Sequence, residues 1–245
     1  MTEPAIDDRP GYRRRFRITP GQGWVTAELE DDFHGMAVTL RHQDGVATRV
    51  EPEEDRPPWT TCPGAMAQVV ATFEGLPLAD FAERGGKTQN CTHLFDLAQL
   101  AAAHASDAEP LVYDVLAEDP VEGRRRIELR RNGVPVLLWV EENGRFVEPP
   151  DLSGYSVHNM RPYIDGLPPE AREPARVLRW GGLVALGRTI PLEMQSDATR
   201  MPPNCYTFQP ARAAEARRIG EIRDFSAGTA EPLDRREAGG AGPAR

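Results

Sequence analysis

Two short turns constrain the fold of this chain more than any other feature of its 245 residues. Asp44-Gly45 and Asn143-Gly144 each stand between two stretches in which apolar and polar residues alternate. An Asx-Gly pair in that setting is typical of a β-hairpin turn. The sequence therefore predicts at least two antiparallel hairpins.

Helical patterns follow each hairpin. The first helix is expected to begin at Cys62-Pro63, because proline is favoured in the first turn of a helix, where its missing N–H is not needed. Asn90 is a good N-cap for a second helix over 91–105. A third helix is predicted over 169–186, with Gly181-Gly182 as its weak point.

These elements predict an α+β protein built from two strand-rich hairpin units, each followed by helices. The other expected segments are a disordered N-terminus (1–10), a first unit (11–105), a second unit (106–225), a disordered tail (226–245), an acidic Pro-rich loop (51–58) and a short last helix (211–219). The two units share the outline strand, Asx-Gly turn, strand, Val-Glu-Pro. An internal duplication would give this outline, and so would two unrelated hairpins.

Charge and composition exclude several classes of function. The net charge is −9, and nonspecific binding to nucleic acid or to a membrane surface needs a basic face. The longest apolar run, around Leu183 to Leu186, is far shorter than the ~20 residues that span a bilayer. The N-terminus is acidic and polar, unlike a secretory signal. We therefore expect a cytoplasmic protein whose three cysteines form no disulfide framework.

The candidate chemistry is concentrated at the start of the second helix. Cys91 is expected in its first turn, where backbone N–H groups and the helix dipole would stabilise a thiolate and lower the pKa of the thiol. His93 and Asp96 are three residues apart and can share a helix face. A carboxylate bonded to one imidazole nitrogen fixes the tautomer and makes the other nitrogen a better base or ligand.

Cys62 and His34 are the other candidates, one before a helix and one before a strand. With Cys91, His93 and Asp96 they predict a Cys/His/Asp acid–base or nucleophilic site. A metal site of Cys62, Cys91, His93 and His34 is the alternative, since thiolates and imidazoles suit zinc or iron. A structural role is open for each, because a cysteine at a helix start is commonly a small buried hydrophobe.

Arg56, in the Pro-rich loop, and Trp59, directly after it, are candidate substrate-binding groups. Arg56 would hold an anionic group of the substrate, and Trp59 would form a pocket wall. The alternative is a rigid loop with Trp59 packed in the core.

Four segments resemble an uncharacterised bacterial domain-of-unknown-function family, number 2889. They are 31–34 (DDFH), 56–65 (RPPWTTCPGA), 75–78 (GLPL) and 91–97 (CTHLFDL). The resemblance covers about residues 12–225 and is most specific between 31 and 105. It implies a companion of aromatic or steroid catabolism and carries no known biochemical role.

These observations lead to one function and one rival. The leading expectation is a small-molecule catabolic enzyme, a lyase or hydrolase of an aromatic compound, that needs no cofactor. His93 would be its base, with Cys91 or Cys62 as acid or nucleophile. The rival is a metal or iron–sulfur binding protein without turnover. The expected partner is a small-molecule substrate rather than nucleic acid or membrane, and the second half would either cover the site or mediate homodimerisation.

Overall fold

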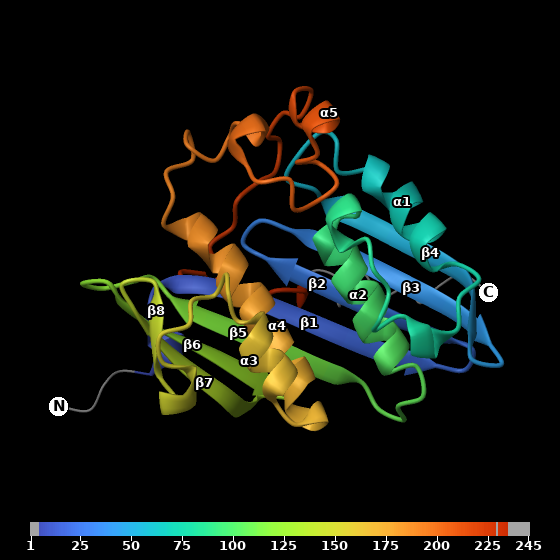
Figure 1. Ribbon diagram of the computed structural model, residues 1–245, viewed down its shortest axis with the longest axis horizontal. Coiled ribbons are helices and arrows are strands. Elements are labelled where there is room, and N and C mark those ends of the chain that lie inside the picture. The colour runs from blue at the N-terminus through green and yellow to red at the C-terminus, as the bar shows by residue number, and fades with distance from the viewer. Residues whose placement is uncertain (1–4, 229, 235–245) are drawn as a thin grey trace. The chain divides into compact units, whose positions relative to one another are not determined.

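The computed structural model describes residues 5–228 and 230–234 and confirms an α+β architecture. Its strands form one sheet in the order β4-β3-β2-β1-β5-β6-β7-β8 (Figure 1). The strand bounds are β1 Gly11–Gly21, β2 Trp24–Asp31, β3 Gly35–Gln43, β4 Val46–Arg56, β5 Leu111–Glu118, β6 Arg124–Arg131, β7 Val134–Glu142 and β8 Arg145–Glu148. The pairs β2–β3, β3–β4, β5–β6, β6–β7 and β7–β8 are antiparallel.

The helices contain fewer residues than the strands. They follow the hairpins, as the sequence predicted. Their bounds are α1 Gly64–Phe73, α2 Thr92–Ala103, α3 Arg161–Gly166, α4 Pro169–Ala185 and α5 Pro210–Ala213. Single 3₁₀ turns lie at Ile6–Asp8, Leu78–Asp80, Lys87–Gln89, Pro150–Leu152, Leu186–Arg188 and Ala198–Arg200.

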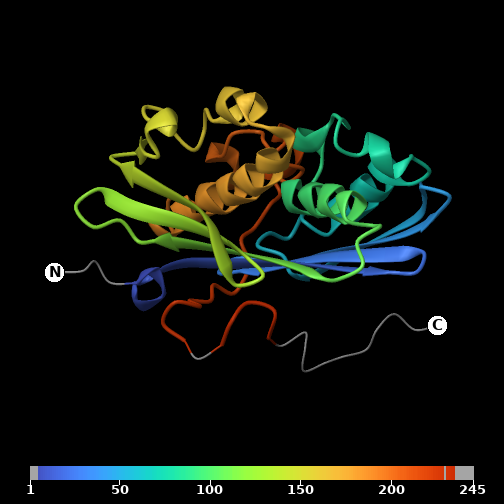
Figure 2. The same cartoon turned by 90° about the horizontal axis from the view of Figure 1, so that it is seen from below.

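The chain divides into two compact units, and the first contains every candidate site residue. This site unit comprises 16–111 and 191–222, so residues 191–222, which were predicted to belong to the second unit, group with the first half of the chain. Within it α2 packs on β2 and β3, and α1 packs on β4, both on the same face of the strands (Figures 1 and 2). Phe73, which stacks on Phe81 at 4.5 Å between ring centroids, is fully buried in its core.

The second unit comprises the described residues of 1–15, 112–190 and 223–245. Its helix α4 runs unbroken through Gly181 and Gly182, where the sequence predicted a weak point. A Cβ at position 181 would stand 2.5 Å from Val115 Cγ1, so the glycine lets the helix approach β5 closely. The cost of glycine in a helix is offset here by packing.

Both hairpin turns are confirmed. Asp44 and Gly45 have φ of 52° and 76°, and Asn143 and Gly144 have φ of 48° and 79°. These are the left-handed conformations that the turn needs and that Asx and Gly tolerate. The duplication of the two units stays a prediction.

Two local predictions were wrong. The loop expected over 51–58 is largely strand, because β4 continues to Arg56 and Pro52 pairs with Val38. Proline lacks the N–H of a ladder bond but is tolerated there, since β4 is an edge strand. The helix expected over 211–219 has only the four residues of α5.

The segments expected to be disordered are partly ordered. Ile6–Asp8 forms a 3₁₀ turn, and Asp7 accepts two hydrogen bonds from Arg130, at 2.9 and 2.7 Å. Ser226 accepts a hydrogen bond from the Gly11 N–H at 2.9 Å. Residues 1–4 of the predicted disordered N-terminus, and residues 229 and 235–245 of the predicted tail, lie outside the described residues.

Candidate functional site

The turn between β2 and β3 is organised by one buried carboxylate. Oδ1 of Asp31 accepts the backbone N–H groups of Phe33 and His34 at 2.7 and 2.8 Å, which is an Asx-turn. The Asp31 N–H in turn donates to the His34 carbonyl at 2.9 Å. Asp31 is fully buried, so its position is fixed by the turn that it builds.

The same carboxylate holds the imidazole of His34. Nδ1 of His34 lies 3.0 Å from Oδ1 and 3.2 Å from Oδ2 of Asp31. A carboxylate is an acceptor only, so this contact places the proton on Nδ1 and leaves Nε2 with the lone pair. Asp31 therefore orients His34 in the way expected of a base or a metal ligand.

Arg56 fixes this turn from the neighbouring strand. Its guanidinium donates to the carbonyls of His34 at 2.8 Å and Asp32 at 3.2 Å, and also to the carbonyl of Asp31. A further bond reaches the Glu221 carbonyl at 2.9 Å. These buried bonds give Arg56 a structural role in the turn, and its substrate-anchoring role stays a prediction.

His93 joins the site from the first turn of α2. Its ring centroid lies 4.0 Å from that of His34, with the planes inclined by 36°. Asp31, His34 and His93 each offer one donor atom, and these three atoms all lie within 4.8 Å of one another. The predicted convergence of His34 and His93 is therefore present, and Asp31 is a member that the sequence analysis missed.

Asp96 forms an ion pair with a lysine. Its carboxylate is buried and forms an ion pair with Nζ of Lys87. Asp31 provides a carboxylate–imidazole bond of the kind that we expected Asp96 to provide. The sequence signal for the Asp31–His34 bond is the D-x-x-H spacing between two predicted strands.

The cysteines lie at helix starts, but their thiols are not activated. Cys91, rather than Asn90, is the N-cap of α2, and α1 begins at Gly64 behind Pro63. Burial raises the pKa of the Cys62 thiol to about 12 and that of Cys91 well above its ordinary value. The prediction of a stabilised thiolate was therefore wrong, because desolvation outweighs the helix dipole.

Both thiols have weak polar neighbours. Sγ of Cys62 lies 3.5 Å from the Thr207 hydroxyl, and Sγ of Cys91 lies 4.0 Å from the sulfur of Met36. Asn90, the expected cap, donates to the Gly86 carbonyl at 2.9 Å instead.

Glu54 is a second residue that the sequence analysis missed. It pairs with Met36 across the β3–β4 ladder. Both of its carboxyl oxygens are buried and accept no hydrogen bond from the described residues. Desolvation raises its pKa from 4.5 to about 7. Lying in the stretch expected to be an exposed acidic loop, it carried no signal of burial.

Trp59 belongs to a core cluster, which was the alternative interpretation of its role. It is buried and meets Phe208 edge-to-face at 5.6 Å between ring centroids. The buried members of this cluster are Trp59, Cys62, Ala198, Ala213 and Ala216.

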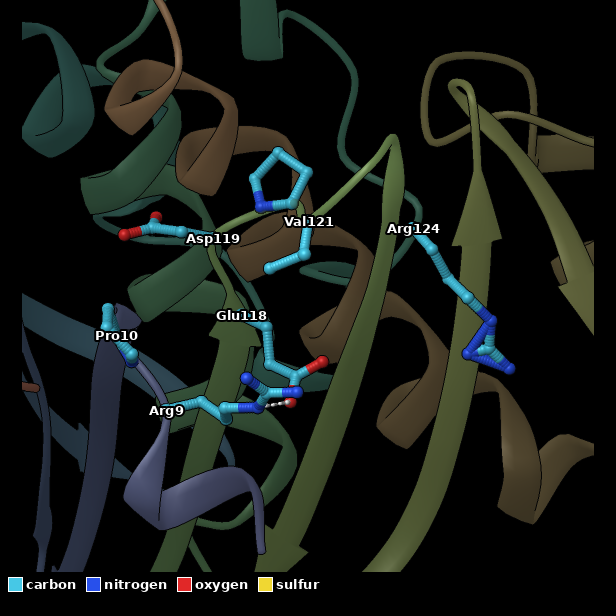
Figure 3. Close-up of a pocket in the computed structure, with 7 residues that line it drawn as sticks. Arg9, Pro10, Glu118, Asp119, Val121 and Arg124 are labelled. Carbon is cyan, nitrogen blue, oxygen red and sulfur yellow. Dashed lines mark ion pairs between the residues drawn. The ribbon is translucent and has the colours of Figure 1, made fainter. Parts of the chain in front are cut away.

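The second unit contains a cavity of about 270 Å³ that is separate from these residues. Figure 3 shows Arg9, Glu118, Asp119 and Arg124 among its lining residues, with Arg9 and Glu118 paired at 3.8 Å. Asp119 is paired with Arg188, whose Nε lies 2.8 Å away. The charged side chains that line this cavity are therefore held in ion pairs.

No family model matches the chain, and no curated protein matches it. None of the helices in the described residues is long and apolar enough to cross a membrane.

Proposed function

We propose that this protein is an enzyme of small-molecule catabolism that uses Asp31, His34 and His93 for acid–base chemistry. The observation that carries the proposal is the Asp31–His34 pair, 3.0 Å from oxygen to nitrogen, beside the ring of His93. A buried carboxylate that fixes one imidazole next to a second is an arrangement of general acid–base sites. The substrate class that we propose is an aromatic compound, and the reaction a lyase or hydrolase step.

The roles follow from the geometry. Nε2 of His34 removes a proton from the substrate, and the Asp31 carboxylate stabilises the imidazolium that forms. The second imidazole, His93, returns a proton to the leaving group or product. The high pKa values of Cys62 and Cys91 argue against thiolate nucleophiles, so the cysteines leave the catalytic set.

A second candidate function uses the same residues as metal ligands. The three donor atoms within 4.8 Å of one another favour it. Two imidazoles and one carboxylate suit first-row divalent ions, with zinc and iron foremost. Bound metal would activate a water molecule or polarise a carbonyl oxygen. In this candidate Cys62 and Cys91 are not ligands.

The free state of all three cysteines supports a reducing compartment, and we propose the cytoplasm. The acidic net charge of −9 supports a small-molecule partner rather than nucleic acid.

The test combines metal analysis with a substrate screen. Protein purified without oxygen is analysed for zinc and iron, and is then screened against aromatic esters and hydroxylated aromatic acids before and after chelation. Turnover that survives chelation, and that falls by about 10²-fold or more in His34→Gln, supports the acid–base proposal. His158→Gln, at an exposed histidine of the second unit, is the matched control.

Two results separate the candidates. Turnover lost on chelation and restored by one equivalent of zinc or iron supports the metal candidate. Unchanged turnover in His34→Gln and in His93→Gln would sink both candidates.

A further inference from the structure

One cation of the site unit is held against two aromatic rings. The guanidinium carbon of Arg218 lies 5.8 Å from the ring centroid of Trp59 and 6.0 Å from that of Phe33. Both distances are those of a cation–π contact, in which the face of the ring attracts the positive charge. The two rings therefore restrain a long side chain that would otherwise sample many rotamers.

The backbone beside Arg218 is joined to the segment that contains Trp59. The two residues form an isolated antiparallel β-bridge. Next to this bridge, the Thr60 N–H donates to the Arg217 carbonyl at 2.9 Å. The end of the site unit is thus fixed beside residues that lie far from it in the sequence, and this pairing places the Arg218 side chain at the two rings.

Phe33 links this cation to the proposed catalytic histidines. Its ring centroid is 6.0 Å from the Arg218 guanidinium carbon and 6.3 Å from the imidazole centroid of His34, which it meets edge-on. These two distances limit the separation between the guanidinium carbon and the His34 ring to about 12 Å. One small aromatic molecule can therefore meet the guanidinium at one end and the imidazole at the other.

Arg218 has no carboxylate partner among the described residues. The other cations of the site are in use, since Arg56 donates to carbonyls of the β2–β3 turn and Lys87 is paired with Asp96. Burial lowers the pKa of the Arg218 guanidinium, although an arginine stays protonated at neutral pH. A partly buried charge without a counter-ion is unfavourable, and a bound anion would offset this cost.

We propose that Arg218 binds a carboxylate of the substrate, so that the compound acted on by Asp31, His34 and His93 is an aromatic carboxylic acid. This inference rests on the proposed function, because it names the substrate class of the same site. A guanidinium can bind a carboxylate through two parallel hydrogen bonds. One unpaired cation balances the single charge of a carboxylate, whereas a phosphate monoester carries about two negative charges at neutral pH.

Equilibrium binding tests this anchor separately from turnover. The reduced full-length protein is titrated in a calorimeter with benzoate, phenylacetate and 2-naphthoate, and with the neutral amide of each acid. Each amide keeps the ring and the shape of its acid but lacks the charge. Chelator is present throughout, so that no metal ion binds the carboxylate. We expect at least one acid to bind about tenfold or more tightly than its amide, which is ~1.4 kcal/mol.

Variants of the arginine identify the anchor. Arg218→Met keeps an unbranched apolar side chain and removes the charge, so it should weaken binding of that acid about tenfold or more and leave the amide within about twofold. Arg218→Lys keeps the charge without the paired hydrogen bonds, and its affinity for the acid should fall between the two. Arg217→Met, at the exposed neighbour, is the matched control and should bind the acid as the wild type does.

Far-ultraviolet circular dichroism checks that each variant is folded. If Arg218→Met does not fold, the wild-type preference for acid over amide and its reduction in Arg218→Lys decide the question. Three results would overturn the proposal. They are acids that bind no more tightly than their amides or not at all, an unchanged affinity for the acid in folded Arg218→Met, and inorganic phosphate that competes with the acid at equal affinity, as at a general anion site.

His34→Gln distinguishes failure of the anchor from failure of the proposed function. This variant should lose turnover and keep its affinity for the acid. Acid binding that depends on Arg218, with no turnover of any acid, would refute the proposed function and leave the anchor standing. Turnover that depends on His34, with equal binding of acid and amide, would do the reverse.

Discussion

The buried carboxyl of Glu54 makes the stability of the protein depend on pH. Its pKa is about 7 in the folded protein, against 4.5 for an ordinary glutamate, because burial disfavours the charged form. The folded state therefore binds this proton more tightly than the unfolded state does. Stability from this group is fully present below pH 4.5 and falls as the pH rises through about 7.

The size of this effect follows from the two pKa values. At ~1.4 kcal/mol for each pH unit, the difference between 4.5 and about 7 corresponds to about 3 kcal/mol of unfolding free energy. A loss of this size is a large fraction of the total stability of a typical domain, ~5–15 kcal/mol. It is therefore within reach of ordinary denaturation measurements.

Glu54→Gln isolates the contribution of this carboxyl. Glutamine keeps the shape of the side chain but cannot ionise, so its buried amide adds a constant that is independent of pH. Urea unfolding is measured from pH 5 to pH 8.5 in chelator for both proteins, and the wild-type free energy is subtracted from that of the variant. We expect this difference to rise by about 3 kcal/mol with pH.

Glu83→Gln, at an exposed residue of the same unit, is the control and should give a difference that does not change with pH. An equally flat difference for Glu54→Gln would mean that this carboxyl ionises at an ordinary pKa. The reasoning from burial would then be refuted.

Three further predictions follow from the packing. Arg56→Met leaves buried turn carbonyls without donors and should lower the free energy of unfolding in urea by about 3 kcal/mol or more. Arg49→Met, at an exposed arginine, is the control and should lower it by less than about 0.5 kcal/mol. Gly181→Ala places a Cβ 2.5 Å from Val115 and should lower the free energy of unfolding by ~1–3 kcal/mol. Gly166→Ala, with open space around it, should lower the free energy of unfolding by less, and equal effects would contradict the close packing of α4. The thiol of Cys62, with a pKa of about 12 against 9.0, should hold ~10³-fold less thiolate at neutral pH than a free cysteine. A disulfide reagent should therefore modify the folded metal-free protein far more slowly than the unfolded chain, and a fast-reacting native thiol would restore the nucleophile hypothesis.

The hairpins could be predicted because their signals are local. Asp44-Gly45 and Asn143-Gly144 carry the turn conformation in the two residues themselves. The length of β4 could not be predicted in this way. Whether Pro52 ends a strand depends on whether that strand lies at a sheet edge, which is a property of the whole sheet.

The histidine pair shows the same division. Asp31 and His34 are three residues apart in a turn between two predicted strands, so their contact had a local signal that could have been recognised. The approach of His93 had none. It depends on α2 lying across β2 and β3, which no spacing within the sequence specifies.

The cysteines show where a correct local rule gives a wrong conclusion. A helix N-terminus stabilises an anion by ~0.3–1 kcal/mol, less than one pKa unit, whereas burial raises the pKa of Cys62 from 9.0 to about 12. The larger effect wins, so the thiol stays protonated. The burial that places Cys62 and Cys91 in the core therefore also removes them from nucleophilic chemistry.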